Sequence, residues 1–326
     1  MKKEELRIVY MGTPDFAVES LRALVEGGYN VVGVVTMPDK PMGRHGSVLQ
    51  PSPVKKYALE KGLTVLQPEK LKDETFLDEL RALKADLQIV VAFRMLPEVV
   101  WNMPPMGTFN LHASLLPQYR GAAPINWAVI NGETETGVTT FLLDEHTDTG
   151  ALLLQKSVEI TNDDNAGTLH DKLMSLGAEV AVETLALLAT GNVTPMAQPE
   201  VATLKPAPKI FKEDMHICWD ETAEHIYNHV RGLSPYPTAF SYIGRLNPDG
   251  TEPTPCVLKL FDIRITDRKS TEIPGKIMLI ASKEMLISTQ NYDISVKILQ
   301  IQGKSKMKIE DFMAGFRFNN YTDYLY

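Results

Sequence analysis

LRIVYMGTP, residues 6–14, is an apolar run that ends in a glycine, a threonine and a proline. This order is typical of a buried strand followed by a tight turn at Gly12, a helix N-cap at Thr13 and a first helical position at Pro14. The following FAVESLRALVEGG, residues 16–28, has helical spacing and stops at two glycines. The chain therefore opens with a strand, a turn and a helix, which is the repeating unit of a parallel sheet.

The same alternation of strands and helices continues over the first 190 residues. Further apolar runs are VVGVVT (31–36), DLQIVVAF (86–93) and TFNLHAS (108–114), and helix-like segments separate them. Strands that are apolar on both faces and alternate with helices indicate a parallel sheet covered on both sides. We therefore predict a doubly wound, Rossmann-like α/β domain over residues 1–190.

A change of composition marks the end of this domain. Residues 191–209 contain four prolines and no periodicity, which predicts an exposed, extended linker. Beyond it, one helix is expected at 221–233, followed by about five short β-rich segments that are separated by Gly and Pro turns. This pattern predicts a small β-barrel over residues 210–326.

Composition limits the classes of protein that the chain can belong to. It has 326 residues with 33 basic and 41 acidic side chains, a net charge of −8, so a protein that coats nucleic acid through a global positive field is excluded. Its two cysteines, Cys218 and Cys256, are too few and too far apart for a disulfide framework or a four-cysteine zinc site. We find neither a signal sequence nor an apolar run of about 18 residues, and so expect a cytoplasmic protein without membrane contact.

Two cofactor classes fit the sequence poorly. The first strand-helix turn, MGTPDF, has one glycine where a dinucleotide fingerprint needs three, which argues against a nicotinamide cofactor. His225 and His229 have the spacing of zinc ligands on a helix, but no glutamate follows His225 and no third ligand is evident. The acidic run 144–148 could hold a divalent cation, although a different role for Asp148 explains it better. We therefore expect no metal.

The segment FNLHASLLPQYRGAAP, residues 109–124, carries the polar groups with the clearest chemistry. Asn110 and His112 are two residues apart on a predicted strand, so their side chains leave the same face about 7 Å apart. Asp148 lies in a later turn, DEHTDTG. An amide donor for an oxyanion, an imidazole that moves a proton and a carboxylate that orients the imidazole suit acyl transfer to an amine.

An isolated Asn-x-His pair is more often a capped strand end with a satisfied histidine. The neighbouring residues favour the catalytic hypothesis. NLHASLLPQYRGAAP (110–124) and DTG (148–150) resemble the pattern of the 10-formyltetrahydrofolate-dependent formyltransferases. Further segments are similar to the members that formylate methionyl-tRNA, and the similarity runs nearly end to end. These segments include MGTPDFA, VTMPDKPMGR, PSPVKKYALEKG, ETGVTTF, AGTLHDKL and QGKSKM.

The resemblance implies roles for the matching residues. Asn110 would bind the formyl oxygen, His112 would stabilise or protonate the tetrahedral oxyanion, and Asp148 would keep His112 cationic and help to remove the amine proton. Residues that would line the folate pocket are Ser114, Leu115, Leu116 and Pro117. The formyl donor would be 10-formyltetrahydrofolate, and the acceptor would be the α-amine of initiator methionyl-tRNA, with no metal and no covalent enzyme intermediate. The resemblance also implies a role in translation initiation, with an OB-like C-terminal barrel that binds tRNA. We expect the protein to be a monomer.

The residues expected to contact tRNA form small basic clusters. One cluster surrounds a loop rich in Pro and Gly and contains Lys40, Arg44, Lys55 and Lys56; another, near the C-terminus, contains Lys304, Lys306 and Lys308. Such clusters can bind the phosphates of an A-form stem, although lysines alone are more often a solvated face. The resemblance favours Arg44 in particular.

Two departures from the family pattern and two rival functions accompany this hypothesis. Phe93–Pro97 replaces a segment that commonly carries Tyr-Gly next to the pterin site, which affects the expected folate affinity. His45–Gln50 carries fewer lysines than relatives do, so we expect fewer positive charges from this loop at a tRNA. One rival keeps the chemistry but uses an amino-sugar nucleotide or glycinamide ribonucleotide as acceptor. The other rival is a non-catalytic RNA-binding module.

Overall fold

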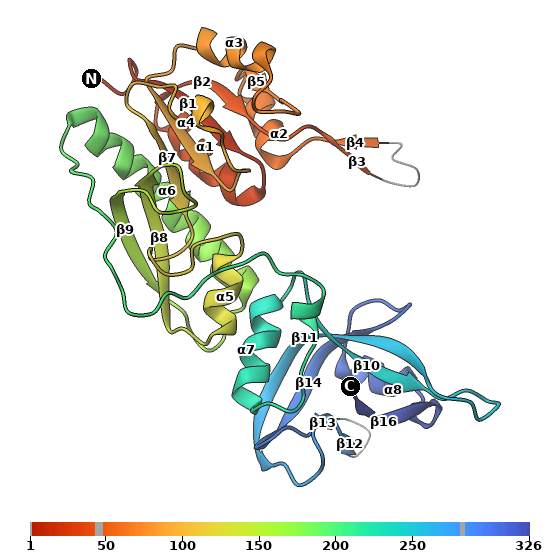
Figure 1. The fold of residues 1–326 in the computed structure, drawn as a ribbon. Helices are drawn as coiled ribbons and strands as arrows, with labels where there is room; N and C mark the ends of the chain where they lie inside the picture. Colours follow the sequence, from red (N-terminus) through yellow and green to blue (C-terminus); the bar gives the residue numbers. More distant parts are fainter. Residues whose placement is uncertain (1, 43–47, 281–283) are drawn as a thin grey trace. The chain divides into compact units, whose positions relative to one another are not determined.

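The computed structural model describes residues 2–42, 48–280 and 284–326 (Figure 1). The chain forms two compact units that exchange short segments. The N-terminal unit contains Met1–Pro124, Glu135–Glu159 and His170–Pro208, and the C-terminal unit contains Ile125–Thr134, Ile160–Leu169 and Lys209–Tyr326. Residues 191–208, called the connecting segment below, thus belong to the N-terminal unit.

A seven-stranded sheet forms the centre of the N-terminal unit (Figure 1). Its order is β5 (Val65–Leu66), β2 (Asn30–Val35), β1 (Arg7–Gly12), β6 (Leu87–Val91), β7 (Thr108–His112), β8 (Glu135–Leu142) and β9 (Leu152–Glu159). The first five strands are parallel and the last two pair antiparallel. The predicted Rossmann-like architecture is confirmed, with an antiparallel edge that the alternation of strands and helices did not predict.

The helices of this unit lie between the strands, as the alternation predicted, although α4 was not predicted itself. They are α1 (Asp15–Glu26), α2 (Pro53–Glu60), α3 (Glu74–Ala82), α4 (Glu98–Trp101) and most of α6 (Ala166–Thr190), whose first four residues belong to the C-terminal unit. A β3–β4 hairpin (Lys40–Met42, Val48–Gln50) precedes α2. Ser52 caps α2 by accepting from the Lys55 N–H at 3.1 Å. The prediction of Thr13 as the N-cap of α1 is wrong, because Pro14 is still extended (ψ 175°) and therefore takes the cap position.

Helix α6 is long and apolar enough, by length and composition alone, to be a candidate membrane span. No membrane-spanning segment was expected from the sequence. Its Leu173, Val180 and Leu185 are fully buried, and Gly177 leaves room for Leu111 of the sheet. The core helix of a globular unit meets the same criterion, so this one helix is weak evidence for a membrane.

The C-terminal unit is an antiparallel, nearly closed barrel with one main helix, α7 (Ala223–Leu233). The strand order is β12 (Ile277–Ile280), β13 (Glu284–Ile287), β14 (Tyr292–Ile301), β11 (Thr254–Lys269), β10 (Ala239–Arg245) and β16 (Tyr321–Leu325). A bridge between Lys276 and Tyr324 joins the two ends of this order. The predicted small barrel is confirmed, and β16, which was not predicted, completes it.

Short elements complete the C-terminal unit. They are α5 (Pro124–Ile130), β15 (Met307–Lys308), α8 (Ile309–Gly315) and the 3₁₀ turns η2 (Glu213–Met215) and η3 (Phe318–Asn320). The barrel core contains Ile226 and Val230 of α7 together with Leu260, Val296 and Leu299 of the sheet. The alternating apolar residues of the strands thus bury one face of the sheet, and α7 contributes its apolar stripe to the same core.

Candidate active site

Strand β7 presents Asn110 and His112 on one face of the sheet. Asn110 lies opposite Val90 of β6 and Phe141 of β8, so it is near the middle of the sheet. Alternation along the strand sends Phe109 and Leu111 to the other face, where both are buried. The Asn110 side chain is partly exposed. This amide is therefore available to a bound molecule.

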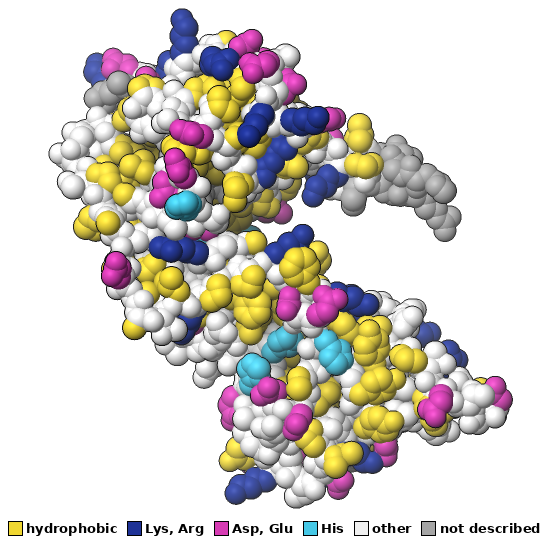
Figure 2. All heavy atoms as spheres, in the orientation of Figure 1, with side chains coloured by type: hydrophobic (Ala, Val, Ile, Leu, Met, Phe, Trp, Pro, Cys, Tyr) yellow, Lys and Arg dark blue, Asp and Glu magenta, His cyan; other side chains and the backbone are white. Residues whose placement is uncertain are grey.

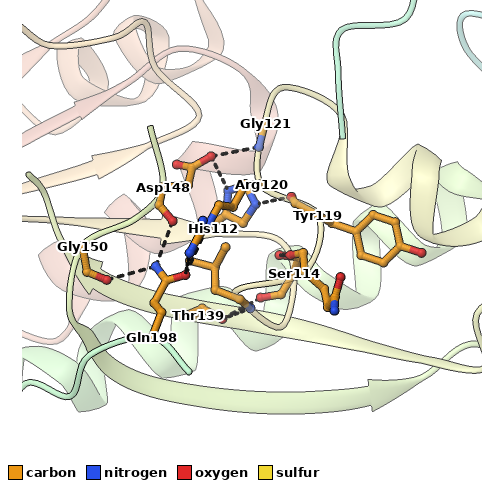
Figure 3. A network of polar contacts seen from close by, with 11 residues as sticks. His112, Ser114, Tyr119, Arg120, Gly121, Thr139, Asp148, Gly150 and Gln198 are labelled. Carbon is orange, nitrogen blue, oxygen red and sulfur yellow. Dashed lines mark hydrogen bonds and ion pairs between the residues drawn. The ribbon is translucent and has the colours of Figure 1, made fainter. Parts of the chain in front are cut away.

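His112 is buried, and one of its two ring nitrogens makes a hydrogen bond (Figure 3). Its Nε2 lies 2.8 Å from the backbone oxygen of Tyr119, and its Nδ1 lies 3.9 Å from Oδ2 of Asp148. A carbonyl oxygen can only accept, so Nε2 carries a hydrogen and Nδ1 is the nitrogen left for chemistry. The distance from Nδ1 to Asp148 exceeds a direct hydrogen bond, so the two groups interact through charge when the ring is protonated.

Asp148 has an unusual backbone conformation, and its carboxylate accepts a hydrogen bond. Its φ is +55°, an uncommon conformation for a residue other than glycine, and Oδ2 accepts from the Gly121 N–H at 2.9 Å. Tyr119 (φ 59°) and Ala92 (φ 47°) share this left-handed conformation. Ala92 directly follows β6, and Tyr119 lies in the loop after β7. Such strained residues gather at functional sites, and ligands bind open α/β sheets at the carboxyl ends of their strands.

A glycine is required directly after this turn. A Cβ built on Gly150 would lie 1.7 Å from the Leu142 oxygen, so no larger residue fits without moving the backbone. Leu142 ends β8, and its N–H donates to the Ala151 oxygen at 2.9 Å. The Asp-Thr-Gly sequence therefore folds tightly against the end of β8, which places Asp148 beside the end of β7.

Polar side chains of β8 and β9 hold the loop that follows β7. Thr139 donates to the Ser114 oxygen at 2.6 Å and accepts from the Leu116 N–H at 3.2 Å. Gln155 donates to the Leu116 oxygen at 2.8 Å and to Thr139 at 2.9 Å. These bonds, together with Ser114 donating to the Gln118 oxygen at 2.7 Å, fix the loop that carries Tyr119.

Comparison with known proteins identifies the family of the chain. The family described as "Formyl transferase" matches residues 6–185, and its "Formyl transferase, C-terminal domain" matches residues 209–317.

The chain belongs to the formyl transferase family.

Relatives named methionyl-tRNA formyltransferase are similar to it over nearly their whole length. The one from Parabacteroides distasonis is 58% identical over 97% of this chain and 98% of its own length. The one from Bacteroides thetaiotaomicron is 55% identical over 98% of both chains. These findings confirm the family resemblance that the sequence motifs predicted.

Solved structures of the formyltransferase fold are similar at much lower identity. An N-formyltransferase from Helicobacter canadensis, in complex with folinic acid and dTDP-3-aminofucose, matches with a TM-score of 0.62 at 19% identity, over 89% of this chain and 98% of its own. HypX from Aquifex aeolicus matches with a TM-score of 0.63 at 18% identity, over 96% of this chain and 48% of its own. At these identities the likeness supports the fold alone.

The residues predicted to line the folate pocket lie in this formyltransferase's loop after β7. Ser114, Leu116 and Pro117 are buried within the protein, and Leu115 is partly exposed. Leu116 packs in a small apolar cluster with Phe141 and Leu152. A contact of these residues with folate stays a prediction.

Arg94, the departure from the family pattern, is anchored within the protein. It donates to the backbone oxygens of Glu69 (2.8 Å) and Pro68, and its guanidinium lies 5.6 Å from the centre of the Phe93 ring. Burial lowers the pKa of Arg94. The arginine therefore ties the segment after β6 to residues 68–69.

The residues predicted to bind tRNA differ in how accessible they are. Lys40 and Lys56 are exposed, whereas the Lys55 ammonium lies 2.7 Å from Asp39. Arg44 lies outside the described residues, between β3 and β4. Figure 2 shows several Lys and Arg side chains over the part of the N-terminal unit that carries α2 and this hairpin. This formyltransferase thus presents positive charge there, although Lys55 is neutralised by Asp39.

The surroundings of His225 and His229 on α7 do not resemble a metal site. His229 is largely buried; its burial lowers its pKa from 6.5 to about 4, and its Nε2 has no hydrogen-bond partner. Among the described residues, no group of three or more His, Cys, Asp and Glu side chains is placed to hold a metal ion. His225 instead lies 3.4 Å from Glu221.

Several residues of the site could not be predicted from the sequence. Thr139 and Gln155 lie on ordinary strand positions, and Gln198 lies in the predicted linker. Only their contacts across the fold show that they support the loops around His112 and Asp148. Tyr119 acts through a backbone oxygen, for which no side-chain pattern exists.

Proposed function

We propose that this formyltransferase transfers the formyl group of 10-formyltetrahydrofolate to the α-amine of methionyl-tRNA and so makes N-formylmethionyl-tRNA for translation initiation. One observation supports this reaction most directly. Nδ1 of His112 faces the Asp148 carboxylate, and the strand that carries His112 also presents the partly exposed Asn110 amide. The full-length similarity to relatives named methionyl-tRNA formyltransferase supports the acceptor.

Each of the three side chains has a chemical task in this proposal. The neutral amine attacks the formyl carbon, and the carbonyl oxygen gains negative charge. The Asn110 amide and the protonated Nδ1 of His112 stabilise that oxygen. Asp148 accepts the proton that the amine loses and returns it to the leaving nitrogen of the folate as the bond of that nitrogen to the formyl carbon breaks, so the enzyme gains no net proton. No covalent enzyme intermediate is needed.

The binding roles belong to the same proposal. Ser114, Leu115, Leu116 and Pro117 would line the folate pocket, since they follow His112 on the loop that Thr139 and Gln155 fix. Lys40, Arg44, Lys55 and Lys56, together with the OB-like barrel, would contact tRNA phosphates, with Lys55 contributing least because Asp39 already neutralises it. The cytoplasmic location and the monomeric state stay predictions.

Formyl transfer from one donor to three acceptors tests the proposal. The full chain would be incubated with 10-formyltetrahydrofolate and, separately, methionyl-tRNA, an amino-sugar nucleotide or glycinamide ribonucleotide. We expect transfer to methionyl-tRNA only, and none when its α-amine is blocked by acetylation. Transfer to another acceptor alone would replace the proposed substrate. Binding of tRNA without any transfer would favour the non-catalytic alternative.

A further inference from the structure

The connecting segment, predicted as a free linker, is hydrogen-bonded to the loops of the site. Met196 pairs with Leu152 at the start of β9, through bonds of 2.7 and 2.9 Å. Ala207 pairs with Gly121 and donates to the Arg120 oxygen at 2.9 Å. The segment thus runs from the strand after Asp148 to the loop after His112.

Gln198 turns inward from the middle of this segment. It is partly buried, whereas every other residue from Thr194 to Pro206 is exposed. Its Nε2 donates to the backbone oxygens of Asp148 (2.8 Å) and Gly150 (3.0 Å), as Figure 3 shows. Its Oε1 accepts from Nε and Nη2 of Arg120, at 3.2 and 2.5 Å. One amide therefore joins the turn of Asp148 to the loop that follows His112.

The segment also fixes the backbone that surrounds the imidazole. Lys205 supplies the oxygen that accepts from the Tyr119 N–H at 2.7 Å, and the Tyr119 oxygen in turn is the partner of His112 Nε2. At Gly121, a Cβ would lie 2.4 Å from the Ala207 oxygen, and φ is +128°, so only glycine fits beneath the segment. The N–H of the same glycine donates to Asp148.

We infer that Gln198 is a positioning residue of the reaction, which holds the Asp148 turn so that its carboxylate faces His112. The inference rests on the proposed function for its catalytic consequence. Asp148 has a strained backbone with φ +55°, and such a conformation persists only where the surroundings hold it. The two bonds from Gln198 act on the turn itself, at the oxygens of Asp148 and Gly150.

Three variants of the full chain test this inference. Gln198→Ala removes all four bonds, and Gln198→Glu keeps an acceptor for Arg120 but loses both donors to the turn. Glu200→Gln, an exposed change in the same segment, is the matched control. We expect both Gln198 variants to lower kcat for methionyl-tRNA about 10- to 100-fold with KM values within about twofold, because orientation and not binding is lost. The control should match the unmodified chain.

A spectroscopic measurement separates this inference from the proposed function. The ring resonances of His112, identified by their loss in His112→Gln, should move in Gln198→Ala and in Gln198→Glu but not in Glu200→Gln. If the unmodified chain formylates no methionyl-tRNA, the proposed function fails while these resonances still test the positioning. Full activity and unmoved resonances in Gln198→Glu would overturn the inference, because the donors to the turn would then be dispensable.

Discussion

His112 Nδ1 and Asp148 Oδ2 lie 3.9 Å apart, although α5 and β8 lie between the two residues along the chain. Each group has a second partner that fixes it: the Tyr119 oxygen holds the imidazole, and the Gly121 N–H holds the carboxylate. The imidazole and the carboxylate are therefore each held in place by a backbone group, independently of the contact between them.

Replacing Asn110 with alanine should slow formyl transfer with little effect on folding. If the amide donates to the developing oxyanion, kcat falls about 10²- to 10³-fold, which corresponds to about 2.7–4 kcal/mol of lost transition-state stabilisation. Steady-state kinetics with methionyl-tRNA measures this effect. The matched control is Asn102→Ala at an exposed position. Undiminished turnover in Asn110→Ala would remove this amide from the mechanism.

Asp148→Asn should abolish most of the activity while keeping the turn. An asparagine oxygen can still accept from the Gly121 N–H, but the negative charge that faces His112 is gone. We expect kcat to fall at least about 100-fold, in the range of general acid–base contributions. Asp171→Asn, which removes the carboxylate of an exposed pair with His170 (3.0 Å), is the control and should be active. Similar rates in both variants would contradict the role of Asp148.

Gly150→Ala should destabilise the N-terminal unit, because its Cβ would overlap the Leu142 oxygen at 1.7 Å. We expect a loss of stability of more than about 3 kcal/mol, beyond the usual range for point mutations. Gly191→Ala is the control, since its φ is +70° but nothing lies within 4 Å of the new Cβ. That variant should lose only about 1 kcal/mol. Denaturant unfolding distinguishes the two, and equal losses would show that contact with Leu142 does not matter.

Lys56→Ala should lower the affinity for tRNA and make that affinity less dependent on the salt concentration. If the exposed ammonium contacts one phosphate, the slope of log affinity against log salt decreases by roughly 0.7–0.9. Titrations of methionyl-tRNA at several salt concentrations measure the slope. Lys72→Ala, also exposed, should leave it unchanged. A slope that is the same in both variants would place the tRNA elsewhere.

His229 should make the protein less stable at mildly acidic pH. Burial lowers its pKa in the folded state to about 4, while the unfolded chain takes up the proton near 6.5. Between these values the unfolded state binds more protons, so the free energy of unfolding falls as the pH falls, by about 3 kcal/mol in total. His229→Gln should lose this part of the pH dependence, and the exposed His225→Gln should retain it. Urea unfolding at pH 7 and pH 4.5 measures both, and parallel behaviour of the two variants would refute the assignment.

Much of the fold could be predicted because its signals are local. The apolar runs and helical spacing of residues 6–36 predicted β1, α1 and β2, and the Gly and Pro turns predicted most barrel strands. The antiparallel pairing of β8 with β7 and the addition of β16 to the barrel could not be predicted. Pairing partners and strand direction depend on contacts between distant segments, and no local pattern specifies them.

The amino-acid sequence was enough to name the family and its three candidate catalytic residues, because the Asn-x-His motif and the Asp-Thr-Gly turn are short and contiguous. It could not specify that His112 has only Nδ1 left for chemistry, or that Gln198 of the predicted linker binds the Asp148 turn. Those facts depend on backbone oxygens and side chains that meet only after the chain has folded. Their distances are therefore set by packing across the sheet rather than by neighbours along the chain.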